Sequence, residues 1–240
     1  MIKAPLFKNE KERLATLERY RILDTPPEKA FDEITWLVAY ICETPIAYIS
    51  IVDKERQWFK SKVGLTAEQT PRDIAFCAHA ILETHTMIVS DALTDERFSD
   101  NPLVLEDPKI RFYAGTPLVS PEGFPLGTLC AVDRQPRTLN PRQLEALGAL
   151  ATQAESLLEY RRISLELREA LSEIKMLSGL LPMCAWCKRI RDENDNWNNL
   201  ERYIAEHSNA DVTHGICPDC RKKHFEERKP IDKPPDFRSF

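Results

Sequence analysis

The spacing of apolar residues predicts that the chain opens with two helices. Residues 8–22 keep near-helical spacing, and the Asp-Thr-Pro-Pro stretch at 24–27 ends that helix. A second helix is expected over about 28–42, because its apolar residues gather on one face and Pro45 follows its last turn.

The apolar period then changes to that of β-strands. Residues 46–53 and 56–64 are β-branched and aromatic runs separated by a polar turn, and 111–120 with 124–133 repeat this arrangement around Pro-Glu-Gly. We therefore expect two hairpins. The polar, Asp- and Pro-rich stretch at 93–110 is long for a connection, and loops of that length often carry function.

A long helix is expected after the second hairpin. Asn140 can cap its first turn together with Gln143, Pro141 fits the first helical position, and no further proline appears until Pro182. Its second half carries a heptad-like stripe, formed by Ile163, Leu167, Ala170, Ile174, Leu177 and Leu181. This stripe predicts a parallel coiled coil, and so a homodimer through the 141–181 helix. The alternative is one amphipathic helix folded back on the core.

Composition and charge limit the class of protein. Hydrophobic residues make up 42% and charged residues 30% of 240, which is globular composition. No apolar run approaches the ~20 residues that a membrane span needs, and the first residues lack the apolar core of a signal peptide. We expect a cytoplasmic protein with no membrane contact.

Two Cys-x-x-Cys pairs stand near the end of the chain. Cys184 with Cys187 and Cys217 with Cys220 can supply four thiolates at tetrahedral corners, which predicts a closed, structural Zn²⁺ site. The surrounding segment holds few large apolar residues, so a metal would supply the stability that its core lacks. His214 could be a further ligand or donate a hydrogen bond to one. The alternative is a thiol redox switch.

The charge around these cysteines bears on the kind of partner. Lys and Arg balance Asp and Glu over residues 184–240, and the basic run 221–223 is short. A phosphate reader needs a positive face, so we expect a protein partner, with a zinc-ribbon nucleic-acid binder as the alternative.

Five segments in the first two thirds of the chain, taken in their order, form a familiar set of motifs. They are RLATLERYRILDTPPEKAFDEIT, TPIAYISIVDKERQWFKSKVGL, TPRDIAFCAHAI, DERFSDNPLV and IRFYAGTPLVSPEGFPLGTLCAVD. Together they resemble the GAF domain of bacterial sensor proteins over about residues 8–160. The resemblance implies an α+β fold, with a six-stranded antiparallel sheet flanked by helices. It also implies a small-molecule or redox sensor that dimerises through its terminal helices.

The resemblance places a ligand pocket between the sheet and the 73–113 region. The ligand-binding candidates there are Trp58, Phe76, Cys77, His79, Phe98, Phe112 and Tyr113. Core packing is the alternative role for each aromatic ring, and an inert buried thiol for Cys77. Ala78 separates Cys77 from His79, unlike the Cys-His pair of GAF domains that attach a bilin, and the NKFDE-type signature of cyclic-nucleotide GAF domains is absent. The ligand is therefore an unknown small molecule.

These observations divide the chain into four parts. We expect a GAF sensor domain at 1–160, a coiled-coil linker helix at 161–182, a four-cysteine zinc module at 183–225 and a disordered tail at 226–240. No catalytic constellation can be assigned, so the expected function is that of a non-enzymatic sensor or adaptor. The enzymatic alternative is a thiol reductase of the methionine sulfoxide type that uses Cys77 and Cys130.

Overall fold

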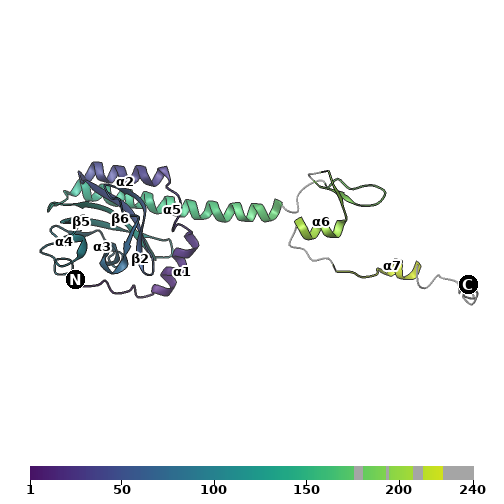
Figure 1. Ribbon diagram of the computed structural model, residues 1–240, viewed down its shortest axis with the longest axis horizontal. Helices are drawn as coiled ribbons and strands as arrows, with labels where there is room; N and C mark the ends of the chain where they lie inside the picture. Colours follow the sequence, from purple (N-terminus) through teal and green to yellow (C-terminus); the bar gives the residue numbers. More distant parts are fainter. Residues whose placement is uncertain (176–180, 193–194, 208–212, 224–240) are drawn as a thin grey trace, which may run out of the picture. The chain divides into compact units, whose positions relative to one another are not determined.

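The computed structural model describes residues 1–175, 181–192, 195–207 and 213–223. The chain divides into two compact units, Met1–Arg168 and Glu169–Phe240, and each is described by itself (Figure 1). The expected tail at 226–240 lies outside the described residues.

The first unit is built on an antiparallel sheet of six strands in the order β3-β2-β1-β6-β5-β4. The strands are β1 (Ile46–Val52), β2 (Arg56–Val63), β3 (Gln69–Pro71), β4 (Met87–Val89), β5 (Phe112–Val119) and β6 (Pro125–Asp133). The two predicted hairpins, β1–β2 and β5–β6, are confirmed, and so is the α+β class with its six-stranded sheet.

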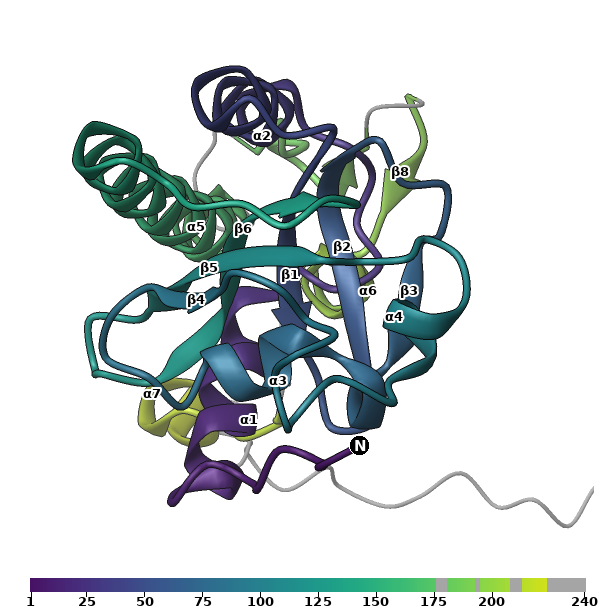
Figure 2. The same ribbon diagram turned by 90° about the vertical axis from the view of Figure 1, so that its left-hand side faces the viewer.

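Helices cover both faces of this sheet (Figure 2). One face carries the three longer helices, α1 (Glu10–Tyr20), α2 (Lys29–Cys42) and α5 (Pro141–Lys175). The other face carries the short helices α3 (Phe76–Ala80) and α4 (Pro102–Leu105), and the short helix η1 (Arg72–Ile74) connects β3 to α3. All seven residues of β1 are buried because both of its faces are covered.

A β-bulge in β2 sends two successive side chains to the same face. Ser50 pairs with Phe59 and Ile49 pairs with Ser61, so Lys60 is the extra residue between them. Phe59 packs on the α3 side, whereas Lys60 and Ser61 contact residues at the start of α2 on the opposite side.

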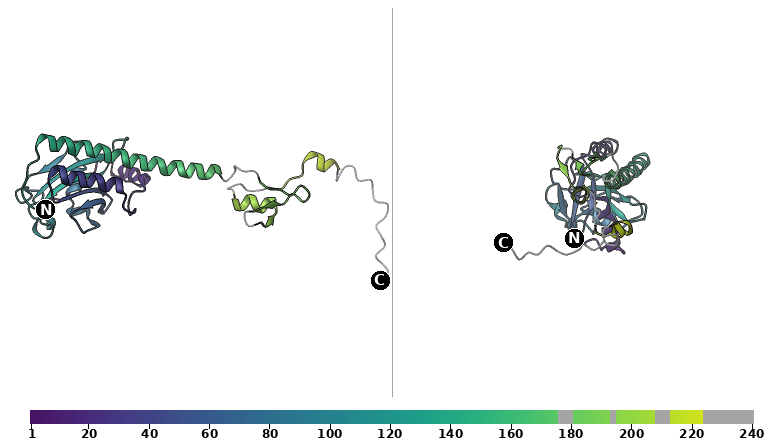
Figure 3. Two further views of the ribbon diagram at one scale, coloured as in Figure 1. Left: turned by 90° about the horizontal axis from the view of Figure 1, so that it is seen from above. Right: turned by 90° about the vertical axis from the view of Figure 1, so that its right-hand side faces the viewer.

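Helix α5 begins with the predicted reciprocal cap. The Asn140 N–H donates to Gln143 Oε1, and the Gln143 N–H donates to Asn140 Oδ1, both at 3.0 Å. The first half of α5 buries Leu147, Ala151, Ala154 and Leu158 against the sheet, on the same side as α2 (Figure 3).

The second half of α5 exposes apolar side chains at Ile163, Leu167 and Leu171. The predicted helix extended to 181, whereas α5 is described to Lys175 and Leu181 lies outside regular structure. The predicted coiled-coil residue Leu177 lies outside the described residues. The side chain of Ile174 does too, so the coiled coil stays a prediction.

The second unit contains short elements. They are the two-stranded hairpin β7 (Ile190–Arg191) and β8 (Trp197–Asn198), and the helices α6 (Leu200–His207) and α7 (Pro218–Arg221). Across the described part of the chain, no helix combines the length and apolar character that crossing a bilayer requires.

Candidate functional site

A cavity of about 210 Å³ lies on the α3 side of the sheet, toward its β3 edge. The strands β1, β2 and β6 form its floor, while the β2–β3 connection and the segment after α4 form its walls. Its lining consists of Ile46, Tyr48, Gln57, Phe59, Gly64, Leu65, Thr66, Ala67, Thr70, Leu103, Asp107, Pro108, Ile110, Val132 and Arg134.

Two side chains that line this cavity each hold a buried polar atom without a hydrogen-bond partner in the described structure. They are Gln57, through its Oε1, and Thr70, through its Oγ1. The two residues are direct cross-strand partners on β2 and β3. Buried polar atoms in folded proteins are nearly always satisfied, so a pair of unsatisfied atoms on one cavity wall marks a place where a ligand group or water completes the bonding.

The wall formed by the β2–β3 connection is fixed by specific contacts. The Lys62 ammonium donates to the carbonyl oxygens of Thr66 and Ala67, at 2.8 and 2.7 Å. Gly64 has a φ of +72°, and a Cβ there would lie 2.1 Å from the Pro45 carbonyl oxygen. Only glycine fits this turn, so the connection is held against the cavity in a defined shape.

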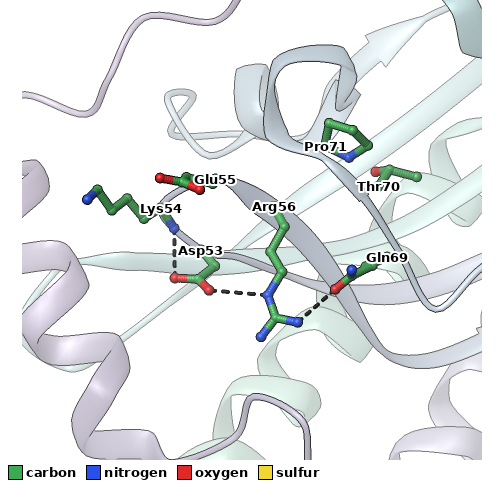
Figure 4. A pocket seen from close by; sticks show the side chains of 7 residues that line it. All are labelled: Asp53, Lys54, Glu55, Arg56, Gln69, Thr70 and Pro71. Atoms are coloured by element: carbon green, nitrogen blue, oxygen red, sulfur yellow. Dashed lines mark hydrogen bonds and ion pairs between the residues drawn. The ribbon is translucent and has the colours of Figure 1, made fainter.

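A second, open groove runs across the β1–β2 turn and β3 (Figure 4). Its central side chain is Arg56, whose guanidinium donates to Gln69 Oε1 at 2.7 Å and to Asp24 Oδ1 at 3.0 Å. Asp53 lies 3.4 Å from the same guanidinium. The central guanidinium of Arg56 is already paired with Asp53 and Asp24, so we assign this groove no ligand.

The seven predicted ligand residues divide between the two faces of the sheet. Trp58 and Phe112 belong to the core under α1, α2 and α5, away from the cavity. The expectation placed them on the ligand side, but side chains alternate along a strand, and Gln57 and Phe59 occupy that side of β2.

The other five predicted residues lie together on the α3 side. Phe76 stacks on Phe98 with ring centroids 4.0 Å apart and lies 5.2 Å from the Tyr113 ring. His79 meets the edge of Phe98 at 4.9 Å, and its Nε2 contacts the Ile2 carbonyl oxygen at 3.0 Å. These side chains fill the core beside the cavity without lining it, and their contact with a ligand stays a prediction.

The buried thiols of Cys77 and Cys130 lie against each other with 3.6 Å between their sulfur atoms. The Tyr113 hydroxyl is 3.3 Å from each sulfur, and the Thr128 hydroxyl is 3.0 Å from Cys130 Sγ. Tyr48, which lines the cavity, places its hydroxyl 3.8 Å from Cys77 Sγ. A polar cluster therefore connects the cavity wall to the thiol pair.

The polar cluster shifts the pKa values of Cys77 and Cys130 in opposite directions. Burial alone would raise the pKa of Cys77, but hydrogen bonds from its neighbours, first of all Cys130, lower the pKa to about 6. Burial raises the pKa of the Cys130 thiol well above its ordinary value. The low dielectric around two sulfurs in contact accommodates one negative charge and disfavours a second.

Each Cys-x-x-Cys pair forms a turn with a thiolate-stabilising contact. The Cys187 N–H donates to Cys184 Sγ at 3.5 Å, and the Cys220 N–H donates to Cys217 Sγ at 3.4 Å. Such backbone donors lower the pKa of Cys184 and of Cys217.

The two pairs are not joined in the structure. Among the described residues, no group of three or more His, Cys, Asp and Glu side chains is placed to hold a metal ion. The imidazole of His214 contacts Glu201 Oε1 at 2.9 Å through its Nε2. Residues 208–212, which connect α6 to the second pair, lie outside the description, so a shared metal site stays a prediction.

Comparison with known proteins gives the family of this α+β domain. The model of the GAF domain matches residues 26–158, more than half of the chain, and the protein belongs to the GAF domain family.

A curated relative is 42% identical over 160 residues, which cover 67% of this chain and 26% of that protein. It is a cyclic di-GMP phosphodiesterase of Pseudomonas aeruginosa. The chain thus spans about a quarter of the length of this relative.

Similar solved structures show the fold alone. One is the blue-light absorbing form of the PixJ GAF domain of Thermosynechococcus elongatus, 12% identical with a TM-score of 0.50, covering 68% of this chain and 95% of that one. Another is the free methionine-R-sulfoxide reductase of Neisseria meningitidis in complex with its substrate. It is 17% identical with a TM-score of 0.47, covering 68% of this chain and 99% of that one.

Proposed function

We propose that this protein is a non-enzymatic signalling sensor and adaptor. Its GAF domain binds a small molecule in the cavity beside β2 and relays that event through α5 to the four-cysteine segment, which docks a partner protein. The observation that carries the proposal is the placement of cavity and helix on opposite faces of one sheet, with β2 contacting both sides. The activity named for the Pseudomonas relative is not extended to this chain, because the matched segment is a small part of that protein.

The bulge in β2 supplies a physical route between cavity and helix. Phe59 lines the cavity, and the Lys60 ammonium on the other face donates to Glu28 Oε1 at 2.7 Å. The same Glu28 oxygen accepts from Arg161 Nε of α5 at 2.9 Å. A ligand that shifts β2 therefore acts on contacts that hold the point where α5 leaves the sheet, a coupling of the hinge or helix-shift kind.

Dimerisation through α5 is supported by its exposed apolar side chains. Ile163, Leu167 and Leu171 are 48%, 57% and 48% exposed on this helix. On α2, the exposed rings of Trp36 and Tyr40 stack with centroids 5.4 Å apart. A second copy that covers these residues would bury them in a helical interface.

The proposed zinc site rests on the conformation of the two Cys-x-x-Cys turns. Each turn already directs a backbone N–H at its first sulfur, which is the environment a metal-bound thiolate needs. The ion would be held by the four thiolates of Cys184, Cys187, Cys217 and Cys220. His214 would be a further ligand or donate a hydrogen bond to one of them. Zinc bound in this way supplies folding free energy to a segment with a small core and leaves no open coordination position.

A thiol reductase is the second candidate, favoured by the contact between Cys77 and Cys130 at 3.6 Å. Both side chains are 0% exposed, so a substrate would have to displace core side chains to reach them. Turnover of free methionine sulfoxide by wild type that disappears in Cys77→Ser would establish this function and remove the sensor proposal.

Two measurements on the full chain test the sensor proposal. Wild-type protein purified without added zinc should contain about one zinc per chain by plasma mass spectrometry, and Cys217→Ser should lose it. Leu65→Trp places a large ring in the cavity and should change hydrogen exchange of α5, with Leu93→Trp as an exposed control. Metal-free wild type would refute the zinc site, and unchanged exchange in α5 would refute the relay.

A further inference from the structure

The cavity has a size and a wall composition that restrict what it can hold. Its volume of about 210 Å³ is that of about seven water molecules in the liquid, and is smaller than the usual pocket for a drug-sized ligand. The apolar floor and walls include the buried side chains of Ile46, Phe59, Ile110 and Val132. The occupant therefore has a compact apolar body.

One side of the cavity presents unpaired oxygen atoms that a hydrogen-bond donor of a ligand can satisfy. Gln57 is 2% exposed, and its Oε1 has no partner within the described structure. Thr70 faces it across the β2–β3 pair, and its Oγ1 is likewise unpaired rather than bonded to the amide. A carbonyl oxygen can only accept and a hydroxyl can accept as well, so a ligand N–H aimed between them satisfies both atoms. Leaving these atoms unpaired costs folding free energy that such a ligand recovers.

The charges of the lining exclude an ionic ligand from the interior. Within the described lining the charged side chains are Asp107 and Arg134, one of each sign, and both are exposed. Arg134 Nε donates to the Pro108 carbonyl oxygen at 3.1 Å, which keeps the guanidinium at the mouth. A charged group placed beside Gln57 would be desolvated without a counter-ion.

We propose that the cavity recognises a small neutral molecule with an apolar ring or chain and an N–H donor, such as an azole, lactam or primary amide, bound through Gln57 Oε1 and Thr70 Oγ1. This inference rests on the proposed sensor function and names the ligand class of its site. It excludes nucleotides and cyclic dinucleotides from this cavity, because they are multiply charged and larger than the space.

Matched probe pairs test the donor requirement. Indole and benzofuran differ in one N–H, and benzamide and acetophenone differ in an NH₂ against a methyl group. Titrations of the full chain are followed by ¹H–¹⁵N chemical shifts. The N–H member of each pair should bind about tenfold more tightly than its partner, which is the value of one satisfied hydrogen bond.

Two substitutions locate the effect. Gln57→Met keeps the length of the side chain and removes one of the two acceptors, so it should reduce the difference within each pair. Gln153→Met makes the same change at an exposed position of α5 and should leave it intact. Equal binding within each pair in wild type, or an undiminished difference in Gln57→Met, overturns the donor assignment.

The outcomes also separate this inference from the sensor function itself. Binding of none of the four probes in the millimolar range overturns the proposed ligand class. The relay is judged independently, by whether Leu65→Trp changes hydrogen exchange in α5. A changed exchange with no probe binding would keep the sensor and remove the ligand class.

Discussion

The contact between Lys60 and Glu28 is the most informative place to perturb the fold. The Lys60 side chain is 0% exposed, and its ammonium donates to Thr25 Oγ1, the Pro26 carbonyl oxygen and Glu28 Oε1. Glu28 supplies the negative charge, because the other two acceptors are neutral. Glu28→Gln keeps the size of the side chain and one acceptor oxygen but removes that charge.

The expected loss of stability follows from the burial of the two partners. Removing one member of a fully buried pair costs about 3–5 kcal/mol, whereas an exposed pair contributes about 0–1 kcal/mol. Lys60 is fully buried, but the Glu28 side chain is 40% exposed and water screens it. Lys60 also keeps two acceptors, while Arg161 loses a charged partner. We expect Glu28→Gln to lower the free energy of unfolding by about 2 kcal/mol.

Urea unfolding followed by tryptophan emission measures this loss. Trp58 is buried in the same core as Phe31 and dominates emission at short wavelength, while the other three tryptophans are exposed. Glu33→Gln is the matched control, because Glu33 meets Lys29 in an exposed pair at 3.4 Å. A loss under about 0.5 kcal/mol, or equal losses in the two variants, would refute the argument from burial.

Three further predictions follow from other contacts. Burial opposes ionisation of Glu10, but Arg13 and Arg72 outweigh it and lower the pKa to about 2, so its stabilisation should be present above about pH 4.5 and lost toward pH 2. The free energy of unfolding of Glu10→Gln should not show this loss between about pH 4.5 and pH 2. The same pH dependence in Glu10→Gln and wild type would contradict the prediction. Leu167→Glu should convert the proposed dimer to a monomer in light scattering. A monomeric wild type would refute the proposed interface. Metal-free native protein should react rapidly with a thiol reagent at four of its seven cysteines, since the other three are buried; faster reaction at Cys77 would show that its burial is not maintained.

The sheet and its helices could be predicted from sequence because their signals are local. Two hairpins appear as β-branched and aromatic runs around short polar turns, and the Asn140–Gln143 cap is visible in four consecutive residues. The strand β3 has three residues and no apolar alternation, so its pairing with β2 could not be foreseen.

The candidate site was harder to predict because it depends on register. The prediction chose aromatic residues as ligand-binding candidates, yet Trp58 and Phe112 face away from the cavity. Gln57 was missed since glutamine is ordinarily exposed, whereas here it is 2% exposed and pairs with Thr70 of β3. The signal that could have found it is its place between Arg56 and Trp58, where a one-residue alternation puts it on the side opposite the tryptophan.

The strand β2 lines the cavity and also contacts helix α5 through Glu28, so we expect ligand binding and the position of α5 to be thermodynamically coupled. Gln57 contacts the ligand side, and the bulge at Lys60 fixes β2 to Glu28 and, through it, to Arg161 of α5. Loosening that anchor lets β2 move, so a ligand must order the strand as it binds. We expect Glu28→Gln to weaken indole binding by about 2- to 30-fold, the range of a coupling of about 0.5–2 kcal/mol, while Glu33→Gln leaves it unchanged.

Linkage requires the reverse effect as well. Saturating indole should increase the hydrogen-exchange protection of α5 around Arg161 in wild type, and less so in Glu28→Gln. Equal affinity in wild type and both variants, together with protection of α5 that ignores indole, would show that the cavity and the helix are independent. In that case the bulge at Lys60 contributes only to the stability of the fold. A strand that transmits a signal cannot be loosened on its α5 face without changing the affinity for a ligand on its cavity face.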